Sequence, residues 1–322
     1  MTTEPSAPAA KAPRIPGTLR WGVLLALATA AISGISIWVN AFAVKQLPDP
    51  AVYTTVKNGV AAVLLLALVA ATVRPAQVRA ITPRSWGWLL LIGVVGGSLP
   101  FILFFTGLAQ ASAPSAAFIH KTLFVWVALL AVPFLGERLG FVQLGALGVL
   151  LAGQALVLTP AGVTWGAGET MIAAATLLWA VESIVAKRVL RSVPSQVVGA
   201  SRLGAGLLVL VGYLAVTGKL GVVSGLTPVQ WGWAMLTGLF LLGYVGTWFA
   251  ALQRAPASLV TAILVLGAPV TALAQVLQTG AAPTVPALTG QLLILVAGAV
   301  LALPAVLRHR DASNRAMEPA RT

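Results

Sequence analysis

The residues most able to do chemistry in this chain are the few polar side chains that interrupt long apolar runs. His120 and Lys121 lie in AAFIHKTLFVW and Glu182 lies in AVESIVAK, while Lys57 and Arg202 each fall one to two turns inside an apolar segment. A charge in the middle of a bilayer costs on the order of 3 kcal/mol, so it is seldom left facing lipid without a partner. Such residues are typical of a binding site or pathway for a polar solute.

Each of these residues also has a structural explanation. Lys121, the deepest cation, can bond to a backbone carbonyl or extend its stem toward the interface, and the other two cations can do the same. Glu182 lies about one turn from the end of its segment, where Lys187 or Arg188 offers an ion-pair partner. His120 can be a satisfied interior histidine. The sequence leaves both explanations open.

Neutral side chains inside the same apolar runs complete the set. Trp38 and Trp248 lie deeper than the interfacial tryptophans, so they can stack on a planar solute or fill the core, and Asn40 and Asn58 supply amides. The candidate substrate-binding residues are Lys121, His120, Asn40, Trp38, Lys57, Asn58, Glu182, Arg202 and Trp248.

Composition indicates that the chain is dissolved in lipid. Hydrophobic residues make up 59% of the chain and charged residues 8%, against roughly 25% charged residues in a soluble domain. The net charge is +13, but the basic residues lie between apolar runs and form no surface stripe, so we expect no nucleic acid partner. The chain has no cysteine, its two aspartates lie outside the apolar segments, and its two histidines cannot form an HExxH zinc site. We therefore expect that the protein is not an enzyme and that it binds no cofactor and no metal.

Ten apolar segments have about the length that a helix needs to cross the hydrocarbon, which is ~20 residues. The backbone finds no hydrogen-bond partner in lipid, so each segment is predicted to be helical. The segments are 21–44, 52–73, 86–109, 114–135, 141–159, 168–186, 196–217, 229–252, 257–278 and 287–307. Residues 1–20 are predicted to be a disordered tail and 308–322 a short polar tail.

The basic residues predict the orientation. With the amino terminus in the cytoplasm, fifteen Lys and Arg residues fall on the cytoplasmic side, and only Lys45 and Lys219 fall outside. The remaining three lie within segments. This bias follows the positive-inside rule and predicts that both termini are cytoplasmic.

A repeated motif shows how the ten segments are organised. TPRSWGWLLLIG starts at Thr82 and TPVQWGWAMLTG at Thr227, 145 positions later, with seven of twelve residues identical. Lys57 and Arg202 have the same spacing, and Asn40 precedes Lys45 by five positions, as Glu182 precedes Lys187. Because five helices form one unit, the second unit enters the membrane from the opposite side. Inverted repeats of this kind are a common plan of secondary transporters.

Two glycine-containing motifs predict local helix geometry. Gly93 and Gly97 are spaced for close helix approach. The run Gly267-Ala268-Pro269 falls midway along segment 257–278, where it should break or kink the helix. A break could expose carbonyls to a cavity, whereas a plain kink would have no further role.

At these residues the chain resembles the drug/metabolite transporter superfamily, specifically proteins with two EamA repeats. The residues that carry the resemblance are Trp38, Asn40 and Lys45, the basic residues Lys57 and Arg202, and the run Leu135-Gly136-Glu137-Arg138-Leu139. The second half departs from the pattern, since Gly280-Ala281-Ala282-Pro283 replaces the Gly-Glu motif. The resemblance implies ten helices, export or uptake of small metabolites, and frequent proton coupling or antiport.

The sequence thus predicts an all-α membrane protein of ten transmembrane helices in two inverted-topology repeats, 21–160 and 161–307. The expected function is secondary transport of a small metabolite, such as an amino acid or organic acid, by alternating access in the inner cell membrane. A passive channel, a scaffold and an exporter of hydrophobic drugs are the alternatives. The expected partners are the solute, lipid and coupling protons, with the protein a monomer or homodimer.

Overall fold

The computed structural model describes residues 16–316 except 109, 112 and 159–164, and every regular element in these residues is a helix. The first repeat contains α1 (Pro16–Gln46), α2 (Pro50–Thr72), α3 (Pro75–Arg79), α4 (Pro83–Gly97), α5 (Leu99–Leu108), α6 (Ala113–Lys121), α7 (Leu123–Leu135) and α8 (Phe141–Leu158). The second contains α9 (Ala167–Val189), α10 (Ser195–Val216), α11 (Leu220–Ser224), α12 (Pro228–Arg254), α13 (Ala257–Leu264), α14 (Gly267–Thr279) and α15 (Val285–Ala316).

The predicted tails fall mostly at the limits of this description. Residues 1–15 and 317–322 lie outside the described residues. The first helix starts five residues earlier than expected, and α15 continues to Ala316 into the segment where a polar tail was expected.

Each repeat crosses the membrane five times. Nine stretches of the described residues are long and apolar enough to cross, counting the pairs α4–α5, α6–α7 and α13–α14 as one crossing each. The remaining crossing is α8, whose 18 residues give about 27 Å of helix at 1.5 Å per residue. This length is close to the ~30 Å hydrocarbon core. The fold is an all-α membrane protein of two inverted repeats of five crossings, as predicted.

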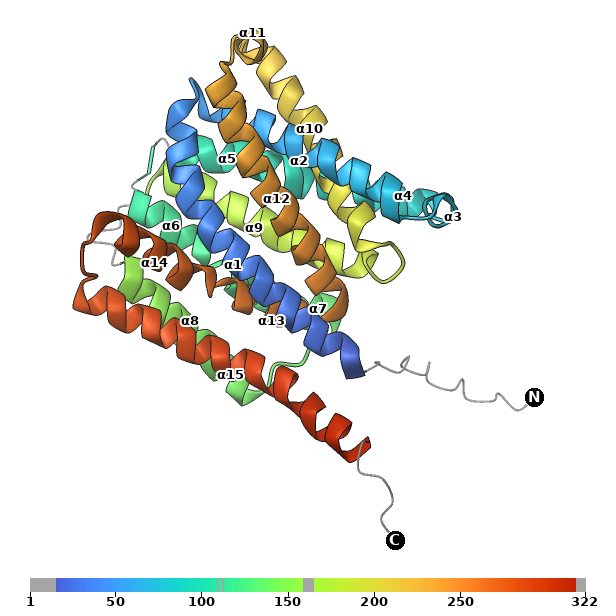
Figure 1. The fold of residues 1–322 in the computed structure, drawn as a ribbon, viewed down its shortest axis with the longest axis vertical. Coiled ribbons are helices and arrows are strands. Elements are labelled where there is room, and N and C mark those ends of the chain that lie inside the picture. Colours follow the sequence, from blue (N-terminus) through green and yellow to red (C-terminus); the bar gives the residue numbers. More distant parts are fainter. Residues whose placement is uncertain (1–15, 109, 112, 159–164, 317–322) are drawn as a thin grey trace.

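The repeated motif opens equivalent helices. Thr82 and Thr227 are the N-caps of α4 and α12, and each side chain accepts a hydrogen bond from the backbone N–H three residues later. The short helices α3 and α11, which precede these caps, also begin 145 residues apart. They lie far from each other on the molecule (Figure 1). We call the two ends of the bundle the α3 side and the α11 side.

Three of the crossings are interrupted. The predicted interruption at Gly267 is a break between α13 and α14, and the equivalent crossing of the first repeat breaks at Thr122, between α6 and α7. A third break, at Ser98 between α4 and α5, was not predicted. It has no counterpart in the second repeat, where α12 is continuous from Pro228 to Arg254.

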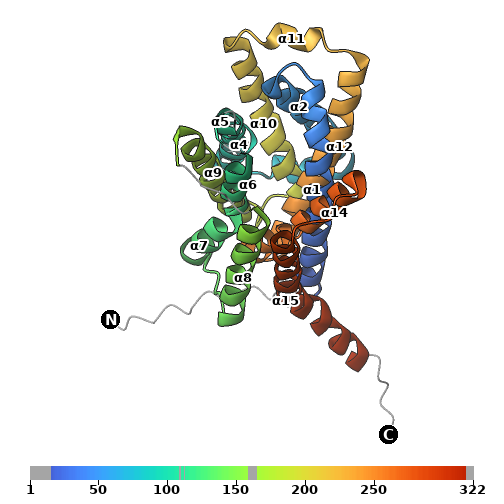
Figure 2. The same ribbon diagram turned by 90° about the vertical axis from the view of Figure 1, so that its left-hand side faces the viewer.

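Close glycine contacts hold neighbouring helices together. A Cβ on Gly93 would lie 2.4 Å from the Cβ of Ala205, and one on Gly97 would lie 2.2 Å from the carbonyl oxygen of Arg202. Both glycines therefore pack directly on α10, which confirms the predicted close approach. The last crossings of the two repeats, α8 and α15, lie side by side (Figure 2) and meet at Gly153 and Gly290.

The apolar core differs between the two ends of the bundle. One large cluster fills the α3 side, with residues such as Leu89, Val189 and Ala255. On the α11 side the described core consists of two separate clusters. The first, which we call the α2 lobe, comprises Ala43, Leu47, Val52, Tyr53, Val56, Leu214, Leu226 and Ala234. The second, the α6 lobe, comprises Ala116, Ile119 and Ile172. The apolar core is therefore continuous on the α3 side and divided into two lobes on the α11 side.

Candidate functional site

A cavity of about 270 Å³ lies between the two repeats. Side chains from both repeats line it, on α1, α2, α5, α6, α7, α9, α10, α12, α13 and the α13–α14 break. Six of the nine candidate residues lie in its wall: Lys57, His120, Lys121, Glu182, Arg202 and Trp248. Trp38, Asn40 and Asn58 do not line it.

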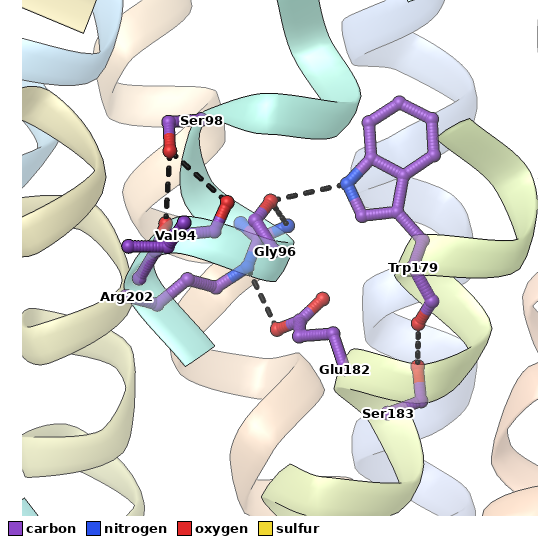
Figure 3. A network of polar contacts seen from close by, with 8 residues as sticks. Val94, Gly96, Ser98, Trp179, Glu182, Ser183 and Arg202 are labelled. Atoms are coloured by element: carbon purple, nitrogen blue, oxygen red, sulfur yellow. Dashed lines mark hydrogen bonds and ion pairs between the residues drawn. The ribbon is translucent and has the colours of Figure 1, made fainter. Parts of the chain in front are cut away.

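The break at Ser98 provides a carbonyl that no helix uses. Pro100 lacks an N–H, so it cannot bond to the carbonyl oxygen of Gly96 four residues earlier. That oxygen instead accepts hydrogen bonds from Arg202 Nη2 at 3.0 Å and Trp179 Nε1 at 3.1 Å. Figure 3 shows both donors converging on Gly96, with Ser98 Oγ bonded to the carbonyl of Val94 beside the break. The broken helix thus positions a cation and an aromatic ring at the cavity.

Glu182 on α9 forms an ion pair with Arg202 on α10, within the second repeat. Arg202 Nε donates to Glu182 Oε1 at 2.9 Å, and both side chains are buried. The carboxylate packs on the broken helix, because a Cβ on Gly96 would lie 2.3 Å from the carboxyl carbon of Glu182. The partners considered from sequence bond elsewhere: Lys187 donates to the carbonyls of Leu252 and Ala255, and Arg188 donates to the carbonyl of Phe134.

Lys57 stands in the equivalent place in the first repeat. Its Nζ donates to Asn40 Oδ1 at 3.2 Å and lies 5.0 Å from the ring centroid of Tyr53, whose hydroxyl also bonds to Asn40. Asn40 does not line the cavity itself, but it holds Lys57, which does. Asn40 and Glu182 occupy matching positions in the two repeats. Lys57 bonds to Asn40 and Arg202 bonds to Glu182, so each cation bonds to a side chain on the first helix of its own repeat. The acceptor is neutral for Lys57 and anionic for Arg202.

Lys121 and His120 enter the cavity wall from the end of α6. Lys121 forms no ion pair or hydrogen bond with any described residue, and the apolar Leu264 and Val265 line the cavity from the matching region of the second repeat. The ring of His120 contacts Trp179 with centroids 4.9 Å apart, and its Nδ1 is buried without a partner in the described structure. The adjacent residues His120 and Lys121 therefore both line the same cavity.

Aromatic rings form the apolar part of the wall. The rings of Phe101, Phe104 and His120 surround Trp179, with centroids 5.3, 5.8 and 4.9 Å from it. On the other side Tyr244 stacks on Trp248 at 6.0 Å. Sequence reasoning missed Phe101, Phe104 and Tyr244, although Pro100 in the middle of an apolar segment signalled that this helix is irregular.

Two remaining candidates have other surroundings. Trp38 Nε1 donates to Gln278 Oε1 at 2.8 Å, which joins α1 to α14. Asn58 is 1% exposed, and neither polar atom of its amide has a hydrogen-bond partner among the described residues. Thr54, one turn earlier on α2, is equally buried and its hydroxyl is also unpartnered.

Polar contacts join the repeats on the α3 side. Glu137, which follows α7, accepts hydrogen bonds from the backbone N–H of Ala257 at 2.6 Å and of Ser258 at 3.2 Å, and from the Ser258 hydroxyl. A carboxylate at this position caps the first turn of α13 and favours its positive end. Glu137 therefore has a role beyond packing, and the run 280–283 that replaces its motif in the second half holds no carboxylate.

An ion pair on the α11 side lies next to the α2 lobe. Lys219 Nζ contacts Asp49 Oδ2 at 2.7 Å, and Asp49 also caps α2. Burial acts to raise the pKa of Asp49, but the hydrogen bonds from Lys219 and from the backbone of Ala51 and Val52 outweigh it and leave the pKa lowered. The hydrogen bond to Asp49 raises the pKa of Lys219.

The fold and the cavity together define a class, that of ten-crossing membrane proteins with inverted repeats around a cavity lined by aromatic and charged side chains. The EamA-like transporter family matches residues 20–159 and again 166–303. The chain therefore belongs to the EamA-like transporter family, with two copies of the repeat.

Comparison with solved structures supports the fold. Among 29 matching chains is one titled only "Crystal structure of protein", which aligns with a TM-score of 0.75 and 19% identity over 88% of this chain and 98% of its own. No curated protein matches the sequence.

Proposed function

We propose that this protein is a secondary transporter of a small anionic metabolite, such as an amino acid or organic acid. The charge of the cavity is the observation that carries the proposal. Lys57, Lys121 and Arg202 line it against one carboxylate, Glu182, which leaves a formal charge of +2 when His120 is neutral. Two buried positive charges in excess stabilise an anion held between them.

The proposed mechanism is alternating access. Inverted repeats allow one architecture to open to either face of the membrane. The divided core of the α11 side and the continuous core of the α3 side support an arrangement open to the α11 side. The excess of Lys and Arg on the α3 side supports placing that side, with both termini, in the cytoplasm. The protein would then face outward in an inner cell membrane.

Export of hydrophobic compounds is the second candidate. The aromatic lining around Trp179 and Trp248 favours it, because rings bind planar apolar compounds well. The uncompensated Lys57 and Lys121 oppose it, since an apolar occupant would leave both charges without a counterion. A passive channel or a scaffold would require neither the cavity charges nor the inverted repeat.

The test begins with a screen for metabolites that raise the melting temperature of the purified protein, because a ligand of the folded state stabilises it by mass action. Each hit is then labelled and assayed for counterflow in proteoliposomes. A carrier accumulates the label against a gradient of unlabelled solute, whereas a channel only equilibrates it. Hits that are mainly neutral and apolar would favour the drug-export alternative, and absence of counterflow with every hit would refute transport by alternating access.

A further inference from the structure

Arg202 has N–H groups at the cavity wall that form no hydrogen bond with any described residue. A guanidinium carries five N–H groups, and the pair with Glu182 uses one of them, through Nε, while Nη2 donates one to Gly96. Nη1 makes no hydrogen bond with any described residue, and neither does the second carboxylate oxygen of Glu182. The pair is therefore held through one oxygen and one nitrogen, and it lacks the two parallel hydrogen bonds that make arginine–carboxylate pairs strong.

The backbone fixes Arg202 independently of Glu182. The Gly96 carbonyl, freed by Pro100, accepts from Arg202 Nη2, and the ring of Phe101 lies 6.0 Å from the guanidinium carbon. If the carboxylate moved away, these contacts would still hold the guanidinium at the cavity. The second repeat offers Lys57 no such broken helix, because α12 is continuous.

We propose that Arg202 binds the carboxylate of the transported molecule and that Glu182 occupies this position while the cavity is empty. The proposal rests on the proposed function, since it names the group that the cavity recognises. A buried arginine without an anion is strongly unfavourable, so a site that binds and releases an anionic solute needs a substitute between cycles. Glu182 supplies that substitute, and the solute displaces it.

The charges of the cavity allow this exchange. With one monoanionic solute bound and Glu182 still ionised, Lys57, Lys121 and Arg202 leave a formal charge of +1. The displaced carboxylate therefore stays among cations in the cavity. Lys57 differs in kind, because its partner Asn40 carries no charge and gives no competing anion.

Benzoate and its neutral isostere benzamide are suitable probes, because the cavity combines aromatic rings with cations. Their binding to the purified full-length protein is measured by the shift in melting temperature and by calorimetry. Glu182→Gln removes the competing anion, and an internal competitor reduces apparent affinity by the fraction of sites that it occupies. If Glu182 fills nine sites in ten, benzoate should bind Glu182→Gln about tenfold more tightly than the wild type. Benzamide should bind both proteins alike.

Two further variants separate a local site from a general electrostatic field. Glu182→Gln with Arg202→Gln removes both charges and should lose benzoate binding. It also tests the proposal against the wild type if Glu182→Gln alone does not fold. Asp49→Asn is the matched control, because it also removes one negative charge but at the Lys219 ion pair, outside the cavity wall, and benzoate should bind it about as well as the wild type.

Several results would overturn the proposal: equal or weaker benzoate binding in Glu182→Gln, or retained binding in the double variant. An Asp49→Asn protein that gains as much affinity as Glu182→Gln would show a general field effect, and no binding of benzoate to any variant would exclude a carboxylate site. None of these measurements depends on transport. A carboxylate site in a protein without counterflow would refute the proposed function alone.

Discussion

Lys121 is the cavity residue whose charge has least structural compensation. It forms no ion pair with a described residue, and the cost of holding an isolated charge at this depth is ~3 kcal/mol. We expect Lys121→Met to abolish transport while the folded protein is as stable as the wild type or more so. Lys121→Arg should keep part of the activity, since the charge remains while the compact ammonium is lost.

The readouts for Lys121 are counterflow in proteoliposomes and melting temperature in detergent. If Lys121 instead had a structural role, Lys121→Met would lower the melting temperature. Normal transport by a well-folded Lys121→Met protein would remove the residue from the site.

The Asp49–Lys219 pair should make a small, pH-dependent contribution to stability. Asp49→Asn tests it, because asparagine caps a helix as well as aspartate does and only the charge is lost. The pKa of Asp49 is lowered from 3.8, so its contribution is full above that value and disappears as the pH falls through the folded-state pKa. The pKa of Lys219 is raised from 10.5, so its contribution is full below that value and disappears as the pH rises through the raised pKa.

The two proteins should therefore differ most between these limits, by less than about 1 kcal/mol in the free energy of unfolding, because the pair is partly exposed. Chemical unfolding at neutral pH and at an acidic pH well below 3.8 measures the difference. A difference that persists unchanged at the acidic pH would mean that the ion pair does not cause it.

At the scale of elements, the cap on α13 is the contact most open to test. Glu137→Ala removes three hydrogen bonds and a favourable charge at a helix N-terminus, and we expect a loss of about 1–3 kcal/mol of stability. Glu137→Gln keeps an acceptor but not the charge, so its loss should be smaller. Thermal or chemical unfolding of both variants measures the effect, and equal stability of Glu137→Ala and the wild type would show that the cap contributes nothing.

The sequence predicted the elements better than the contacts between them. Apolar length and the Thr-Pro caps placed the ends of the crossings to within three residues, except at the start of α1 and the end of α15, and Pro269 correctly signalled the break before α14. Pro100 carried the same signal for α5 and was overlooked. The pairing of Glu182 with Arg202 could not be read from spacing, because it depends on how α9 and α10 pack against the broken helix. Lys187 and Arg188 are nearer in sequence but reach carbonyls instead.

At the scale of the whole molecule, the inverted repeat makes a direct prediction about topology. A reporter that is active only in the cytoplasm should be on when fused after Arg84 and off when fused after Gly225. These positions lie on the α3 side and the α11 side, respectively. Immunoblots of both fusions control for expression. Equal activity at comparable expression would contradict the inverted arrangement.

Alternating access predicts opposite changes in labelling in the cavity wall and in the buried core of the α3 side. The chain has no native cysteine, so single thiols can be introduced directly. A thiol at Ser36, in the cavity wall, should be modified readily in the empty protein, and one at the fully buried Ala186, on the α3 side, should not. A transported ligand should reduce the first rate and raise the second. Rates that both stay constant would favour a static channel or a scaffold.

The twin caps at Thr82 and Thr227 have a consequence for biogenesis. Equivalent threonine caps open α4 and α12 at opposite ends of the bundle, so the motif itself cannot tell the insertion machinery which way a helix should enter. That information must come from the residues beside it. The stretch before and within the first cap contains Arg74, Arg79 and Arg84, whereas the second has Lys219, which is paired with Asp49. After a duplication, a handful of arginines would thus suffice to send two nearly identical segments into the membrane in opposite directions.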